Sequence, residues 1–184
     1  MLEKDVIEKF DSKNIFINDF KMAYNKMKNK KECKELAFLC AGTDRVIGDC
    51  FGPLVGSKLL ELLEKENISN VNVLGSLERN INYNNIENII EKVNNKTGLI
   101  VIDAALSKKE NIGKIFVTNK STVLGKGLNK NKIDIGDISI KSVVAKDYRI
   151  PGYNFKSLQN TSLNEIMKLS NIVAEGIYDV IKNY

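Results

Sequence analysis

The sequence predicts an α/β fold, a three-layer sandwich in which about five strands form a mostly parallel, twisted sheet with helices on both faces. Three observations lead to this prediction. Residues 36–41 are an unbroken apolar run, and residues 99–105 are apolar except for Asp103, as in strands that are buried on both faces of a sheet. An amphipathic helix opens at Pro53, after the turn segment that follows the first run. Strand-like and helix-like segments continue to alternate beyond this helix, which favours a parallel sheet.

The first 35 residues differ from the rest of the chain. They are rich in lysine, and four apolar side chains recur at alternating spacings of four and three residues, as on one face of a helix: Phe16, Phe20, Ala23 and Met27. We therefore predict an N-terminal helical extension over residues 1–35, made of one or two helices that pack on the core or on a partner chain. Residues 36–184 then form a single α/β domain, because a chain of 184 residues with 43% hydrophobic content has room for one substantial core.

The elements of this domain follow in order. The helix at Pro53 has one apolar face, and Gly52 and Gly56 would allow it to approach the sheet closely. Residues 121–136 have three glycines and no clear hydrophobic period, which predicts a long loop. The last helix ends at Ile181 and has Ser157 or Thr161 as its N-cap. The other predicted elements are a strand at 71–74, a helix at 82–93, an edge or hairpin strand at 114–118, a strand at 138–145 and a loop at 146–155.

The composition excludes several classes of site. The chain contains no histidine, so a Ser-His-Asp triad, a Cys-His pair and a His-ligated metal are excluded within one chain. Its three cysteines have no CxxC spacing, which argues against a zinc knuckle or a disulfide framework and favours a reducing cytoplasm. No apolar run approaches the roughly 18 residues of a membrane span. The net charge of +5 is spread along the sequence, so we expect no nucleic-acid groove.

Two aspartates are the candidate catalytic residues. Asp49 lies in the loop after the first predicted strand, and Asp103 lies near the end of the strand at 99–105. In the common strand order 2-1-3 these two strands are neighbours, and ligands bind where the order reverses, at the carboxyl ends of the strands. Two carboxyl groups that face each other there cannot both ionise cheaply, so they can share a proton. We expect Asp49, before a helix N-terminus, to stay ionised and Asp103 to be protonated.

Other interpretations of the same residues stay open. Asp49 is also a suitable cap for the helix at Pro53. Asp44 and Arg45 fit a local ion pair that shapes the loop, Cys50 fits a small buried filler, and Lys126 fits a solvated cation in the long loop. The loop glycines match neither the dinucleotide-binding nor the P-loop pattern, and the two acidic side chains would repel phosphate, so nucleotide binding is not favoured.

Four motifs carry a resemblance to a known family. AGTDRVIGDCFGPLVG (41–56), VIDAAL (101–106), IGDISI (135–140) and SLQNTSLNEIMKLSNIVAEGI (157–177) together resemble the YyaC family, whose members are described as sporulation proteases. The resemblance runs from about residue 36 to the C-terminus. More distantly, the arrangement is similar to the spore germination protease and to the hydrogenase maturation endopeptidases. The resemblance implies a peptidase-like α/β domain over residues 36–184, with its site in the loops after strands 1 and 3.

The resemblance also implies roles for the two aspartates. In the germination protease, the aspartates that match Asp49 and Asp103 are regarded as the catalytic pair. In the hydrogenase enzymes, acidic residues at these two places bind nickel together with a histidine, which this chain lacks. YyaC relatives commonly carry a histidine after the second strand, where this chain has NINYNN (80–85). The loop STVLGKGLNK (121–130) also departs from the proline- and glycine-rich version of the family.

The sequence therefore predicts a sporulation-related protease that hydrolyses peptide bonds with Asp49 and Asp103 as an atypical aspartic pair. The candidate residues for substrate binding or loop shaping are Thr43, Asp44, Arg45, Gly48, Gly52 and Lys126. We expect a protein or peptide substrate, no membrane or nucleic-acid partner, and a cytoplasmic location in the forespore or mother cell. We expect no cofactor and assign no metal ligand, while a divalent metal between the two aspartates and a homo-oligomeric state stay open.

Two alternatives to this function are kept. The first is a regulatory or binding module of the same fold with weak or no activity, which the missing histidine and the altered loop motivate. The second is another acyl hydrolase, such as a peptidyl-tRNA hydrolase-like enzyme, which the shared fold and the positive charge motivate. Salt-sensitive RNA binding would favour the second alternative.

Overall fold

The computed structural model describes residues 2–82, 85–91, 93–124 and 133–182. Its elements in chain order are α1 (Leu2–Lys30), β1 (Glu35–Cys40), η1 (Ile47–Cys50), α2 (Phe51–Lys65), β2 (Val71–Leu74), α3 (Ile86–Ile90), β3 (Thr97–Ser107), η2 (Lys109–Asn111), β4 (Ile115–Thr118), β5 (Thr122–Leu124), β6 (Ile133–Ile135), β7 (Ile138–Lys146), α4 (Pro151–Gln159) and α5 (Leu163–Ile181).

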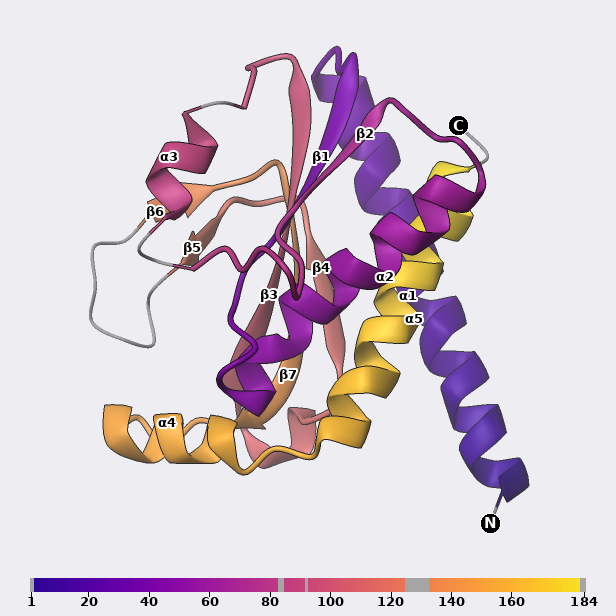
Figure 1. Ribbon diagram of the computed structural model, residues 1–184. Coiled ribbons are helices and arrows are strands. Elements are labelled where there is room, and N and C mark those ends of the chain that lie inside the picture. The colour runs from indigo at the N-terminus through magenta and orange to yellow at the C-terminus, as the bar shows by residue number, and fades with distance from the viewer. Residues whose placement is uncertain (1, 83–84, 92, 125–132, 183–184) are drawn as a thin grey trace.

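Five strands form the central sheet in the order β2-β1-β3-β7-β4 (Figure 1). The strands β2, β1, β3 and β7 run parallel, and β4 pairs with β7 in the antiparallel direction at the edge of the sheet. The predicted α/β fold and the predicted order of the first three strands are confirmed. The carboxyl ends of β1 and β3 are therefore adjacent, which is where the two candidate aspartates were expected to meet.

Helices cover both faces of the sheet (Figure 1), and a hydrophobic cluster lies on each face. On one face, α1, α2 and α5 cover a large cluster in which Phe20, Phe38, Phe51 and Ile102 are fully buried. On the other face, α3 and the small antiparallel β5–β6 pair cover a second cluster that includes Val101. The three-layer arrangement with helices on both faces is thus the one predicted. No helix in the described ranges is long and apolar enough to cross a lipid bilayer.

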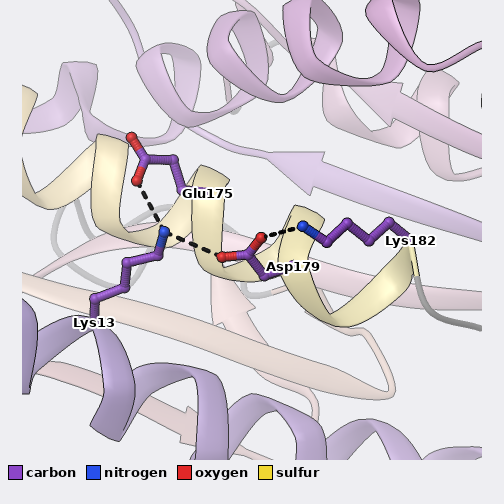
Figure 2. Close-up of polar contacts among 4 residues, drawn as sticks. All are labelled: Lys13, Glu175, Asp179 and Lys182. Atoms are coloured by element: carbon purple, nitrogen blue, oxygen red, sulfur yellow. Dashed lines mark hydrogen bonds and ion pairs between the residues drawn. The ribbon is translucent and has the colours of Figure 1, made fainter.

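The N-terminal segment is a single helix, α1, that packs along α5. The Phe16 ring is buried against Gly176, where an added Cβ would lie 2.6 Å from it, so a glycine lets the two helices touch at this point. Lys13 adds an ionic link, because its Nζ lies 3.0 Å from Glu175 Oε2 and 3.1 Å from Asp179 Oδ2 (Figure 2). Lys182 approaches the other oxygen of Asp179 at 2.7 Å.

Two segments predicted as loops contain secondary structure. Residues 121–136 include β5 and β6, which are three residues each and therefore too short for a hydrophobic period to be visible. Residues 146–155 include the start of α4, which begins at Pro151. The prediction of a loop was wrong there because α4 buries none of its residues, so its sequence has no core-facing stripe.

Three helices also have boundaries that differ from the prediction. α2 begins at Phe51, two residues before the predicted start at Pro53. α3 covers Ile86–Ile90, which is shorter than the predicted 82–93, in keeping with an asparagine-rich segment of moderate helix propensity. The N-cap of α5 is Ser162 and neither Ser157 nor Thr161. Its Oγ accepts a hydrogen bond from the Glu165 backbone N–H at 3.5 Å.

Candidate active site at the strand ends

The loop between β1 and α2 is a compact turn that places Asp49 at the carboxyl edge of the sheet. Asp49 lies in η1, two residues before the first residue of α2. The backbone N–H of Thr43 donates to the Asp49 carbonyl at 3.2 Å, and the N–H of Asp49 donates to the Val46 carbonyl at 3.0 Å. These two hydrogen bonds fix the backbone on both sides of the candidate catalytic residue.

Two of the predicted loop-shaping glycines permit this turn. A Cβ at Gly52 would lie 2.1 Å from the Ala41 carbonyl oxygen, so only glycine lets α2 begin this close to the end of β1. A Cβ at Gly48 would lie 2.8 Å from Leu158 Cδ2 and 3.0 Å from Thr161 Oγ1. The loop is therefore held between the end of β1 and the corner that joins α4 to α5.

Asp103 lies on β3, opposite Lys141 in the register with β7. Its side chain is partly exposed, but the surrounding protein removes enough water to raise its pKa to about 7. The Lys141 ammonium and the Ala104 backbone N–H oppose that rise, whereas the Asp49 carboxylate adds to it. Asp49 and Asp103 therefore interact electrostatically, as expected if their side chains share one site.

Asp49 is also partly exposed, and burial raises its pKa above the usual range. The Thr43 backbone N–H opposes this rise. The expectation from the sequence was that the N-terminus of α2 would favour the charge on Asp49. Burial outweighs the local hydrogen bond at this carboxyl, so both members of the pair hold a proton at a higher pH than an exposed aspartate does.

The other predicted loop residues have structural partners. Asp44 Oδ1 accepts a hydrogen bond from Asn80 Nδ2 at 2.6 Å, and the Arg45 backbone N–H donates to Thr43 Oγ1 at 3.3 Å. No ion pair joins Asp44 to Arg45, two residues whose side chains the structure describes, so the expected pair is not formed. Both side chains are exposed, and the amide of Asn80 satisfies the aspartate instead.

Cys50 and Lys126 complete the set of predicted residues. Cys50 is buried, and burial, followed by the charges of Asp44 and Asp49, raises the pKa of its thiol. A thiol with a raised pKa is a poor nucleophile at neutral pH, in keeping with the filler role. Lys126 lies outside the described residues.

Sequence reasoning missed two residues of this region, Lys141 and Asn80. Lys141 was placed in a predicted strand at 138–145, but only the parallel register with β3 puts it opposite Asp103. Asn80 belongs to the segment after β2, which a bridge between Ala41 and Ile81 brings against the end of β1. Neither contact has a local sequence signal, because each depends on the pairing of segments that are far apart in the chain.

The donor set at this site does not fit a nickel centre. The chain has no histidine, and the described residues contain no group of three His, Cys, Asp or Glu side chains arranged to hold a metal ion. Within the described residues, Asp49 and Asp103 therefore supply two carboxylates without a third side chain of this kind arranged to bind a metal with them. Among the described residues, Lys141 is the cation that lowers the pKa of Asp103, as a bound positive charge would.

Comparisons with known proteins agree with this architecture. The family model described as "Protein of unknown function (DUF1256)" matches residues 7–176. The uncharacterized protein YyaC of Bacillus subtilis (strain 168) is 31% identical over 148 residues, which cover 78% of this chain and 68% of that protein. A crystal structure of the NiFe hydrogenase maturation protease HycI from Thermococcus kodakarensis KOD1 superposes with a TM-score of 0.53 at 18% identity, covering 82% of this chain and 94% of that one. The likeness to HycI is one of fold.

Proposed function

Because the chain belongs to the DUF1256 family of proteins of unknown function and has the fold of a hydrogenase maturation protease, we propose that it is a peptidase. In this proposal, Asp49 and Asp103 hydrolyse a peptide bond of a protein substrate as an atypical aspartic pair. The setting is sporulation or germination, which the family resemblance of the motifs at 41–56 and 101–106 supports.

One observation carries the proposal, namely the pKa of about 7 at Asp103 with Asp49 among its causes. A carboxyl group that holds its proton near neutral pH beside a second carboxyl can act as a general acid while its neighbour acts as a general base. Such perturbed pairs cluster at functional sites. Here the pair also lies at the carboxyl ends of adjacent parallel strands, where open α/β sheets bind ligands.

The chemistry follows from the two protonation states. Asp49, as the carboxylate, accepts a proton from a water molecule, whose oxygen attacks the carbonyl carbon of the substrate. Asp103, as the acid, first donates a hydrogen bond to the carbonyl oxygen. When the C–N bond breaks, a proton passes to the leaving nitrogen, so that one water yields a carboxyl and an amino terminus. Lys141 limits the rise in the pKa of Asp103, so that the proton can leave.

This division of roles predicts a bell-shaped dependence of the cleavage rate on pH. The rate rises as Asp49 loses its proton, above the usual range of an aspartate because its pKa is raised. The rate falls as Asp103 loses its proton, around its pKa of about 7. Because the two groups interact, the two limbs report apparent pKa values of the pair.

The test is to incubate protein extracts from sporulating cells with the purified chain. Mass spectrometry then identifies the cleavage products. Asp49→Asn and Asp103→Asn are each expected to lower the rate at least about 100-fold, since each removes one proton-transfer group. Asp134→Asn, at an exposed position on β6, is the matched control and is expected to cleave normally. Undiminished cleavage by both site variants would reject the aspartic pair. Binding of extract proteins without any cleavage by the wild type would favour the regulatory module instead.

A further inference from the structure

A pocket of about 660 Å³ opens next to the candidate active site, between η2, the end of β7 and α4. In Figure 1, α4 lies across the edge of the sheet at which β7 ends. This volume is within the range of sites that bind small molecules or short peptide segments. The proposed reaction does not use the pocket.

The walls of the pocket carry positive charge. Lys109, Lys146 and Lys156 line it, and each comes from a different element. None of the described residues that line it is acidic, and its adjacent acidic neighbours in sequence, Glu110 and Asp147, do not line it. The carboxylate of Asp147 already accepts hydrogen bonds from the Arg149 backbone N–H at 2.7 Å and from Asn154 at 2.9 Å. The described lining of the pocket therefore contains three lysines and no carboxylate.

Aromatic side chains border the same pocket and remain exposed. The rings of Tyr148 and Tyr153 lie 6.0 Å apart, and the side chains are 46% and 61% exposed. Lys146 Nζ lies 4.6 Å from the centre of the Tyr148 ring, within the range of a cation–π contact. Exposed aromatic groups beside a cavity are typical of a recognition surface, since they contribute large apolar contacts with few rotatable bonds.

The pocket borders the loop that carries Asp49. Thr161 lines the pocket, and its Oγ1 lies 3.0 Å from the place where a Cβ of Gly48 would be. Gly48 directly precedes Asp49 in the chain. Leu158 of α4 contacts the same glycine. The pocket and the Asp49 loop therefore share the corner formed by Leu158 and Thr161.

We propose that this pocket binds an acidic segment of a polypeptide, with the lysines pairing its carboxylates and the tyrosines contacting its apolar side chains. The lysines in the wall favour an acidic ligand by charge complementarity. The limited volume of the pocket favours a short peptide segment over a nucleic acid, because a nucleic-acid backbone needs a longer basic groove on the protein. The binding does not depend on catalysis. That the segment belongs to a protein cleaved at Asp49 and Asp103 rests on the proposed function.

The probe is a fluorescein-labelled octapeptide of alternating aspartate and leucine, titrated with the full chain and followed by fluorescence anisotropy. The same peptide with asparagine in place of aspartate is the first comparison and is expected to bind at least about tenfold more weakly. The triple variant Lys109→Gln, Lys146→Gln and Lys156→Gln is expected to weaken binding of the aspartate peptide at least about tenfold.

A matched variant, Lys21→Gln, Lys26→Gln and Lys65→Gln, removes the same charge from exposed positions on α1 and α2 and is expected to change the affinity less than about twofold. Equal losses in the two triple variants would overturn the proposal, because the attraction would then be that of net charge alone. Tighter binding of a single-stranded RNA decamer, with displacement of the peptide, would overturn it in favour of a nucleic-acid site.

Two further measurements keep the test decisive. Tyr153→Ala changes one exposed side chain and leaves every charge in place, and it is expected to weaken binding about threefold or more. This variant tests the pocket even if the triple variant fails to fold. Asp103→Asn is expected to bind the peptide as the wild type does. Cleavage that persists without peptide binding would reject only the pocket, and peptide binding by a chain that cleaves nothing would reject only the peptidase.

Discussion

The chain holds two aspartates, Asp179 and Asp103, in opposite electrostatic settings. Asp179 lies where α5 meets α1, and burial would raise its pKa, but hydrogen bonds from Lys182 and Lys13 outweigh burial and hold the pKa below the usual range (Figure 2). Asp103 lies at the strand ends, where burial outweighs the opposing effect of Lys141 and raises the pKa to about 7. The first carboxylate is stabilised by the fold, and the second is not.

The difference shows what each region contributes. A carboxylate paired with two lysines stabilises the folded state, so the α1–α5 contact needs no functional explanation. A carboxyl whose pKa is raised makes the folded state less stable at neutral pH than an uncharged residue of the same shape would. The raised pKa of Asp103 therefore lowers the free energy of unfolding at neutral pH, and groups with perturbed pKa values of this kind cluster at functional sites.

The largest expected effect is the pH dependence of stability in Asp103→Asn. Burial raises the pKa of Asp103 from the usual value near 3.8 to about 7 in the folded chain, so the wild type loses stability as the pH rises between these values. The variant has no such proton to lose. The free energy of unfolding of the variant minus that of the wild type is therefore expected to increase between pH 4 and pH 8, by at most about 4 kcal/mol.

Urea denaturation of both chains at pH 4, 6 and 8 measures this gain, with Asp134→Asn as the control that should follow the wild type. A difference that stays flat across these pH values would show that Asp103 titrates normally, and the contrast with Asp179 would disappear.

Lys141→Gln sharpens the contrast by removing the ammonium that lowers the pKa of Asp103. The pKa of Asp103 is expected to move above 7, because burial and Asp49 then act with less opposition. The alkaline limb of the cleavage profile moves to higher pH with it, so that the rate at pH 8 relative to pH 6 increases about threefold.

Carbon-13 NMR of labelled aspartate carboxyls gives the pKa of Asp103 directly. Lys120→Gln, an exposed charge in the turn after β4, should leave the pKa unchanged. A fall in the pKa of Asp103 would contradict the assigned register.

The fold could be predicted from the sequence because its signals are local. The apolar runs that became β1 and β3 identify buried strands by themselves, and right-handed crossovers restrict their order. α4 and the β5–β6 pair were missed for the opposite reason. α4 buries none of its residues, and the two short strands are defined by pairing with each other.

The candidate site divides in the same way. Asp49 was suggested by its place in a loop before a helix, and Asp103 by its place near a strand end. The partners Lys141 and Asn80 come from segments that only folding brings near them. The pKa of Asp103 belongs to this second class, because it depends on how much water the surrounding elements remove.

The smallest expected effect is that of Asp179→Asn, and its sign is opposite. Asp179 is ionised in the folded chain down to a lower pH than usual, so its contribution to stability is present at neutral pH and is lost as the pH falls through that lowered pKa. Because its side chain is 32% exposed, the loss in the variant is expected to be only about 1 kcal/mol at pH 7 and to vanish once the pH falls below the lowered pKa of Asp179.

Urea denaturation of the wild type, Asp179→Asn, Lys13→Gln and the double variant at pH 4, 6 and 8 isolates the interaction between the two side chains and its pH dependence, since a thermodynamic cycle removes their separate effects. Cleavage and peptide binding should be unchanged in all three chains, because α1 and α5 meet away from the strand ends. The opposite result would be that Asp179→Asn becomes more stable relative to the wild type as the pH rises, as expected for Asp103→Asn. It would mean that the folded state raises the pKa of Asp179 too. The two regions would then be alike, and a raised pKa would no longer single out the strand ends as the functional site.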